Sequence, residues 1–170
     1  MYDYTIDKGG IFSLKFRVHH ILCTSLYRGY GYSGPFCENM TKLVSYLREH
    51  LEEPLTLVAT PDAICKNCPN LNSSDFSCAS DGNHVHHKDL ELLKVLGLQE
   101  NEQYTYRKLL EEGLKNFSQT VFEHSCHNCE WYQQGLCKYE DLVKSMKSLL
   151  DKSKADTLCF EQIPKELFYT

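Results

Sequence analysis

The sequence has no uninterrupted apolar run of membrane-spanning length, and its first ten residues, MYDYTIDKGG, contain no apolar signal core. A helix that crosses a bilayer needs about 20 mostly apolar residues, and a secretory signal needs an apolar stretch near its start. We therefore expect a cytoplasmic protein that does not bind membranes. Thiols stay reduced in that compartment.

The sequence also has no strongly basic stripe. Acidic residues outnumber lysine and arginine by 23 to 18, and the formal net charge is −5. The densest basic run, Lys144 to Lys154, is interrupted by Asp151. Because proteins bind nucleic acids largely by neutralising phosphates with clustered basic residues, we expect no nucleic-acid partner. The expected partner is a small molecule or a protein, and the sequence identifies neither.

The cysteines do not have the even count of a disulfide framework. There are nine, and six of them fall into two local groups, which in a reduced compartment favours metal binding. Cys37 and Cys159 belong to no group, and we interpret them as small buried apolar residues.

Two segments of the sequence read as strands joined by a helix. Residues 11–18, IFSLKFRV, alternate strictly, which predicts a half-buried strand, and LTLVA at 55–59 predicts a second strand. An apolar helical stripe lies between them from about Pro35 to Leu51, with Ser33 or Gly34 as its cap. Strand, helix, strand is typical of a β-α-β unit, in which the two strands are parallel.

The rest of the chain shows helical stripes, such as the one at 85–96 that Gly97 ends, and no low-complexity linker. The predicted fold class is α+β and rich in helix. A small sheet with a β-α-β unit precedes several helices, and the cysteine knuckles lie in loops. We expect residues 1–170 to form a single metal-binding domain, with a core at about 11–150 and a C-terminal extension at 151–170.

The two cysteine groups have similar patterns. The first cysteine group, in CKNCPNLNSSDFSC, is Cys65, Cys68 and Cys78, and the second cysteine group, in CHNCEWYQQGLC, is Cys126, Cys129 and Cys137. Each begins with C-x-N-C and ends with one more cysteine. Two cysteines separated by two residues can turn both sulfurs toward one metal ion. We therefore predict that all six are metal ligands.

Two kinds of metal site remain open. A structural zinc takes four ligands, which the two C-x-x-C pairs could supply, but 57 residues separate the pairs and Cys78 and Cys137 would have no role. An iron–sulfur cluster commonly takes four thiolates, and each group supplies three. Neither spacing matches the compact ferredoxin run. We favour an iron–sulfur cluster of the [4Fe–4S] type, with zinc as the alternative.

The segment FRVHHILC, residues 16–23, follows the first predicted strand with a pair of histidines and a cysteine. Parallel strands end at the same edge of a sheet, where ligands bind in open α/β folds. We therefore expect Cys23 to meet Cys65 as a further metal ligand. Arg17, His19 and His20 are candidate catalytic residues: the arginine for an anionic substrate, the histidines for proton transfer or as ligands. The alternative is one buried, hydrogen-bonded histidine beside an exposed one.

Taken together, these motifs resemble an uncharacterised bacterial and archaeal family of unknown function with an R-P-H-H-L-L-C opening. That opening corresponds to residues 17–23, where Val18 replaces the proline, and a G-x-G-Y-S loop corresponds to residues 29–33. A D-x-I-C motif corresponds to residues 62–65, and C-x-x-C-E-W corresponds to residues 126–131. The resemblance implies an iron–sulfur protein and names no substrate.

Three functions are compatible with these residues. The first is an iron–sulfur protein with redox or sulfur-transfer chemistry at the cluster, and whether it is an enzyme stays open. The second is a non-catalytic, zinc-stabilised protein-interaction module. The third is a thiol oxidoreductase using a bare C-x-x-C, which leaves the third cysteine of each group unexplained.

Overall fold

The structure is a computed structural model that describes residues 4–6, 12–79 and 84–152. Cys159 and most of the expected C-terminal extension lie outside these residues. Four strands form one sheet in the order β1-β2-β3-β4, and its inner pair, β2 and β3, is parallel. The strands are β1 (Tyr4–Ile6), β2 (Phe12–Arg17), β3 (Pro54–Val58) and β4 (Gln103–Thr105).

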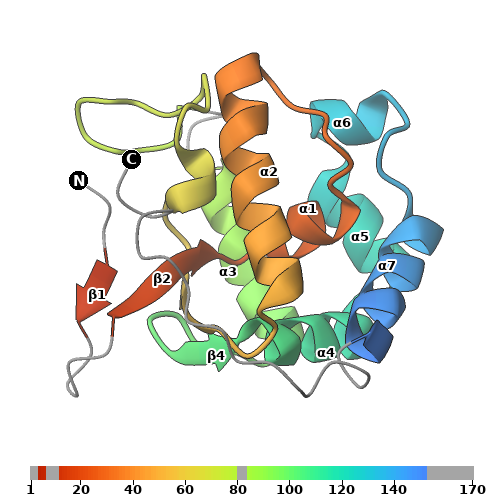
Figure 1. Ribbon diagram of the computed structural model, residues 1–170. Coiled ribbons are helices and arrows are strands. Elements are labelled where there is room, and N and C mark those ends of the chain that lie inside the picture. Colours follow the sequence, from red (N-terminus) through yellow and green to blue (C-terminus); the bar gives the residue numbers. More distant parts are fainter. Residues whose placement is uncertain (1–3, 7–11, 80–83, 153–170) are drawn as a thin grey trace.

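Seven α-helices and one short 3₁₀ turn, η1, complete the described chain. They are α1 (His20–Leu26), α2 (Gly34–Glu49), η1 (Ala63–Cys65), α3 (His84–Leu96), α4 (Tyr106–Asn116), α5 (Gln119–Cys126), α6 (Glu130–Gln133) and α7 (Tyr139–Lys152). Figure 1 shows the strands on one side of α2 and the helices α1, α5 and α7 on the other. The α+β class is thus confirmed. None of the described helices is both long enough and apolar enough to cross a membrane.

The predicted β-α-β unit is present. Leu14 pairs with Leu55 and Arg17 with Val58 in parallel register, and the connection between the strands runs through α1 and α2. The hydroxyl of Ser33 accepts a hydrogen bond from the Phe36 amide at 3.3 Å, with Pro35 in the first turn of α2. Both strands therefore end at one edge of the sheet.

The expectation of a half-buried first strand is wrong. On the face predicted to be polar, Ser13 is buried and bonds the Thr56 hydroxyl, and Arg17 is also buried. An alternating pattern cannot distinguish polar residues that face solvent from polar residues that pair with one another inside the protein.

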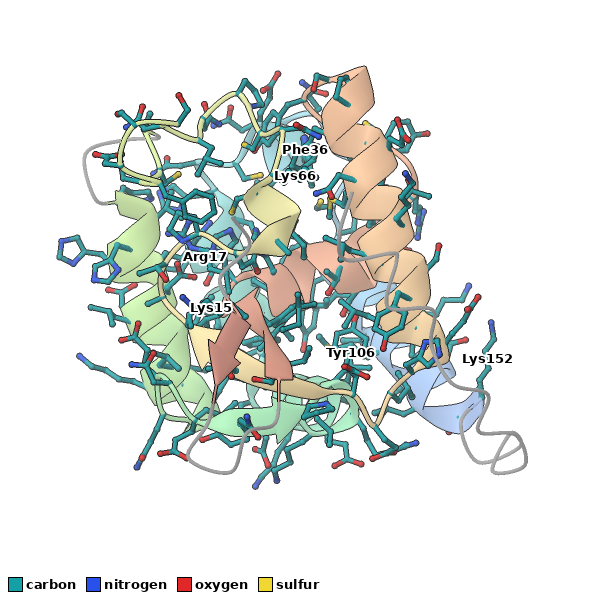
Figure 2. All side chains as sticks on the ribbon, turned by 60° about the vertical axis from the view of Figure 1, so that its left-hand side comes forward. Lys15, Arg17, Phe36, Lys66, Tyr106 and Lys152 are labelled. Atoms are coloured by element: carbon teal, nitrogen blue, oxygen red, sulfur yellow. The ribbon has the colours of Figure 1, made fainter. Side chains whose placement is uncertain are left out.

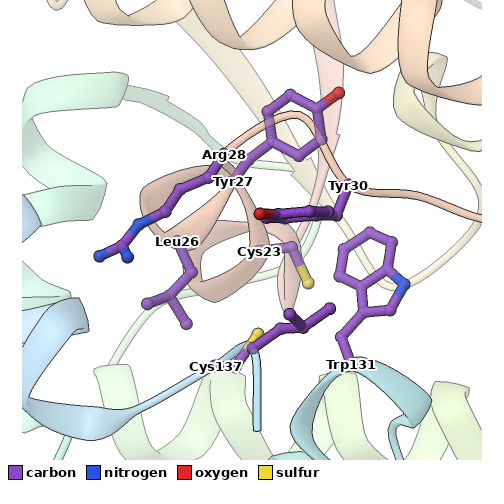
Figure 3. Close-up of a pocket in the computed structure, with 8 residues that line it drawn as sticks. Cys23, Leu26, Tyr27, Arg28, Tyr30, Trp131 and Cys137 are labelled. Carbon is purple, nitrogen blue, oxygen red and sulfur yellow. The ribbon is translucent and has the colours of Figure 1, made fainter. Parts of the chain in front are cut away.

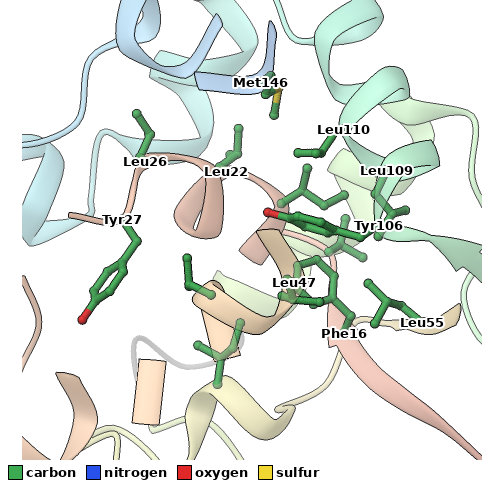
Figure 4. Close-up of a cluster of buried hydrophobic side chains, with 14 of the residues drawn as sticks. Phe16, Leu22, Leu26, Tyr27, Leu47, Leu55, Tyr106, Leu109, Leu110 and Met146 are labelled. Carbon is green, nitrogen blue, oxygen red and sulfur yellow. The ribbon is translucent and has the colours of Figure 1, made fainter. Parts of the chain in front are cut away.

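The apolar core fills the space between the sheet, α1, α2, α4 and α7 (Figure 4). Tyr106, at the start of α4, is fully buried, and its hydroxyl donates to the Thr24 hydroxyl of α1 at 3.0 Å. Gly97 ends α3 with a positive φ of 65°, and the Leu98 amide reaches back to the Leu93 carbonyl, as the glycine cap predicts. This core fixes α1 on the sheet, and α1 carries the opening motif.

Candidate functional site

A cavity of about 240 Å³ lies at the edge where β2 and β3 end. Its walls come from β2, α1, α2, α3, the loop after η1, and α5 with α6. In Figure 2, sulfur atoms gather on the side of Arg17 that lies away from Lys15. The sequence-predicted residues that line this cavity are Arg17, His19, His20, Cys23, Cys65, Cys68, Cys78 and Cys129.

The first cysteine group is carried by η1 and the loop that follows it. Asp62 caps η1 by accepting from the Ile64 amide at 2.9 Å, and the Cys68 amide donates to the Cys65 carbonyl at 2.9 Å, which closes the C-x-x-C turn. A bridge between Leu71 and Cys78 then folds the chain back. The third cysteine of the group thus returns to the C-x-x-C turn.

The second cysteine group spans the end of α5 and the whole of α6. The Cys129 amide donates to the Cys126 carbonyl at 2.8 Å, and Cys129 is the N-cap of α6. Cys137 follows α6 and shares a small cavity of about 20 Å³ with Cys23 and Trp131 (Figure 3). Cys23 of α1 therefore lies near the segment that carries this group.

The thiol of Cys23 lies in the electrostatic field of the whole second group. Burial raises the pKa of Cys23 well above its usual value, and the nearby thiols of Cys129, Cys126 and Cys137 raise it further. Burial also raises the pKa of Cys126 to about 12 and that of Cys137 to about 11. Without a cation these thiols stay protonated at neutral pH, and a protonated thiol is a poor nucleophile. The raised pKa disfavours Cys126 as the attacking thiol of a bare-thiol oxidoreductase.

Arg17, Asp89 and His19 form a polar cluster, and two of its members, Arg17 and His19, line the cavity. The guanidinium Nε of Arg17 donates to Asp89 Oδ2 at 2.6 Å. Asp89 Oδ1 accepts from the His19 amide at 3.0 Å and lies 2.7 Å from His19 Nδ1. Burial alone would raise the pKa of Asp89, but the hydrogen-bonded His19 and the Arg17 charge hold it well below its usual value. Asp89 is therefore an ionised acceptor.

His19 is uncharged at neutral pH. Burial lowers its pKa to about 3, and this effect exceeds the opposing one of the Asp89 carboxylate. Because Asp89 only accepts hydrogen bonds, the proton of the neutral ring lies on Nδ1 and the lone pair on Nε2. His19 can accept a proton or a hydrogen bond at Nε2, but it is not a standing cation.

His20 forms a second carboxylate–histidine pair, with Asp62. Its Nδ1 lies 2.8 Å from Asp62 Oδ2, which also accepts from the Arg17 amide at 2.6 Å. Despite its burial, which would raise its pKa, Asp62 has a lowered pKa because of His20 and these amide donors. Both histidines are thus held by buried carboxylates, so neither fits the alternative of an exposed partner in the pair.

Aromatic rings cover the cavity on the side of α2 and α6. Trp131 lies against Tyr32 and Phe36, with ring centroids 5.2 and 6.2 Å apart. Gly31 permits this packing, because a Cβ there would stand 2.7 Å from both the Phe36 ring and the Cys37 sulfur. The rings limit access of water to the thiols.

Comparison with known protein families gives one match, to the family described as "Protein of unknown function (DUF1284)", over residues 31–135. The chain belongs to this family. Searches of curated proteins and of solved structures found no match.

The DUF1284 match covers only part of the site. It includes the first cysteine group, Cys126 and Cys129, whereas Arg17, His19, His20, Cys23 and Cys137 lie outside the matched residues. The family description assigns no ligand and no reaction. The link between the opening motif and the cysteines within the family match is that they line the same cavity.

Sequence reasoning missed Asp89 altogether. The sequence does contain a sign of it, which is a charged residue within an apolar helical stripe. Asp89 lies three residues before Leu92 and four before Leu93, on the buried face of α3. A carboxylate in such a position is buried, and it needs a partner. Asp62 belongs to the D-x-I-C motif at residues 62–65, but the motif does not predict that it holds His20.

Proposed function

We propose that this protein binds an iron–sulfur cluster through the thiolates of Cys23, Cys126, Cys129 and Cys137. The observation that carries the proposal is the position of Cys23, which lines one cavity with Cys137 and lies near Cys126 and Cys129, so that it offers a fourth thiol to a group of three. Four thiolates are the common ligand set of such clusters.

The donor chemistry fits the cluster. Burial raises the pKa of Cys23, Cys126 and Cys137, and a cationic metal core would supply the charge that favours their thiolates. Lys88 lies near Cys23 and Cys126 and favours their ionised forms. The apolar cover of Trp131 and Leu26 limits solvent at the sulfurs.

The spacing of the thiols favours a cluster over one zinc ion. A tetrahedral zinc with sulfur bonds of about 2.3 Å brings its four sulfurs to within about 3.8 Å of one another. Within the described residues, one group of three donor atoms lies within 4.8 Å of one another, and it is His20, Asp62 and Cys65. A cluster spreads its ligands over several irons, which suits the wider spacing of Cys23 and the second group.

With four thiolate ligands, a bound cluster would supply one-electron transfer. The side chains of this protein would position a small molecule beside it. Arg17 would attract an anionic group, and His19 would accept a proton or hydrogen bond at Nε2. Further proposals are a reduced compartment such as the cytoplasm and a small-molecule or protein partner.

The first prediction concerns the metal content of protein purified or reconstituted without oxygen. We expect a brown protein that absorbs near about 400 nm and holds about four irons and four sulfides per chain. Serine at Cys23, Cys126, Cys129 or Cys137 should remove most of the iron. Cys37→Ser is the matched control, because Cys37 is also a free, partly buried thiol but belongs to neither group.

Equal iron content in the four variants and the control would remove the assignment. Stoichiometric zinc without iron, lost in the same four variants, would establish the zinc-stabilised module instead. The iron and sulfide assays and the absorption spectrum together separate these outcomes.

A further inference from the structure

The first cysteine group still lacks a fourth ligand, and His20 lies beside it. One ring nitrogen of His20, a carboxylate oxygen of Asp62 and the sulfur of Cys65 all lie within 4.8 Å of one another. Cys68 and Cys78 line the same cavity as His20 and Cys65. Nitrogen, oxygen and sulfur donors are thus gathered at the common end of β2 and β3.

Both carboxylate oxygens of Asp62 already accept hydrogen bonds, so Asp62 is better suited to orient the His20 ring than to bind a metal. Its two oxygens accept hydrogen bonds from the Arg17 and Ile64 amides and from the His20 ring. An ionised carboxylate only accepts, so His20 Nδ1 carries the proton and the lone pair lies on Nε2. Histidines that bind metals commonly donate their other ring N–H to a carboxylate in this way.

The loop that carries this cysteine group has no core of its own. From Cys65 to Ala79 no residue is buried, and Phe76 is largely exposed. Asn67 and Phe76 both adopt positive φ angles, 61° and 53°, which are uncommon for residues other than glycine. A loop of 15 residues with this exposure needs another source of order, and a structural metal ion supplies it in many small folds.

We propose that His20 Nε2, Cys65, Cys68 and Cys78 bind one zinc ion, and that Asp62 is a positioning residue that fixes the His20 ring. Three thiolates and one imidazole form a closed tetrahedral set typical of structural zinc. His20 and Cys65 lie close together, and Cys68 and Cys78 line the same cavity. The zinc site shares no ligand with the proposed cluster and goes beyond it.

The test compares two adjacent histidines with equivalent carboxylate partners. Full-length protein should hold one zinc per chain by elemental analysis. His20→Ala should lose it on dialysis against a weak chelator, whereas His19→Ala, whose ring pairs with Asp89, should keep it. Asp62→Asn should weaken zinc affinity by about 10- to 100-fold, as for other groups that orient a ligand.

Cobalt substitution supplies an absorption spectrum that reports the metal ligands and not only whether the protein is folded. Cobalt in the native site should show tetrahedral ligand-field bands with thiolate charge transfer. His20→Cys should retain a metal and gain charge-transfer intensity, because it adds a fourth thiolate. This variant keeps the proposal testable if His20→Ala does not fold.

Three results would overturn the zinc site, and the first two are zinc content that is the same in the His20 and His19 variants, and no zinc in the native chain. Loss of zinc with Cys126→Ser would also overturn it, by showing one shared site. Zinc that depends on His20 in a protein that holds no iron would support this site while the cluster proposal fails.

Discussion

At the scale of single residues, the charges of Arg17 and Asp89 depend on each other. Their side chains are 3% and 0% exposed, and each would be an isolated buried charge without the other. Removal of one partner from such a pair is much more costly than the net stabilisation that the pair provides. Asp89 also holds the His19 ring, so the pair helps to position two residues that line the cavity, Arg17 and His19.

The variant Asp89→Asn should be destabilised by about 3 to 5 kcal/mol at neutral pH, because Arg17 would keep a buried and unpaired charge. The lowered pKa of Asp89 gives the sign of the pH dependence. Its stabilisation is complete above the unfolded value of about 3.9 and is lost as the pH falls through the lower folded pKa. Urea unfolding at pH 7 and at successively lower pH values measures this difference.

Glu91→Gln is the matched control, since Glu91 lies on the same helix and its exposed carboxylate lies 3.3 Å from the exposed His124 ring. It should change stability by less than about 1 kcal/mol. A difference between native protein and Asp89→Asn that stays constant as the pH falls would contradict the role given to the Asp89 charge.

At the scale of elements, α2 holds the end of α1. The Arg48 guanidinium donates from one nitrogen to the Thr24 carbonyl at 2.8 Å and to the Tyr27 carbonyl at 3.0 Å. These carbonyls lie at the C-terminal end of α1, where backbone acceptors have no partner within the helix. Because α1 carries both His20 and Cys23, this cap helps to set the position of two proposed ligands.

Arg48→Met should lower stability by about 1 to 3 kcal/mol, because it leaves buried carbonyls without a donor while keeping much of the apolar stem. Arg48→Lys should recover part of the loss through a single charged donor. The midpoint of urea unfolding checks both variants, and equal midpoints for methionine and arginine would show that the cap is not needed.

The sequence predicts the longer elements well, because their apolar residues recur at the spacing of the backbone. Phe16 belongs to such a series in a strand, and Leu47 belongs to one in a helix. The sequence does not reveal β1, β4 or α6, which have three, three and four residues and are too short to show a period. Parallel pairing of β2 and β3 was predictable because a helical connection between strands leaves few other topologies. The cap from Arg48 depends on tertiary packing, and no local pattern encodes it.

At the scale of the whole molecule, both cysteine groups lie in segments without buried residues. None of residues 65–79 or 126–138 is buried, whereas the core lies between the sheet and α1, α2, α4 and α7. Such segments open readily unless another interaction holds them. The sequence predicts each cysteine of the two groups as a metal ligand. It could not show that Cys23 lies near the second group, because that depends on how α5 and α6 pack near α1.

Removal of metal should therefore loosen the two cysteine segments and leave the sheet intact. Hydrogen exchange followed by mass spectrometry should show faster exchange in 65–79 and 126–138 after chelation, with little change in β2 and β3. Uniform acceleration over the whole chain would indicate that the metal supports global rather than local stability. Unchanged exchange in both segments would contradict a structural role for either site.

The parallel register of β2 and β3 has a consequence for the order of events during synthesis. Leu14 and Leu55 pair although they are far apart in the sequence. Such non-local pairing is slow, because the chain loses the entropy of loop closure before it gains the contacts between the strands. Once β3 has emerged, the ribosome needs to add only the residues up to Cys78 before every proposed zinc ligand exists. The thiols of Cys126, Cys129 and Cys137 appear later in translation. The ligands of the proposed zinc site are therefore all synthesised before those of the proposed cluster are complete.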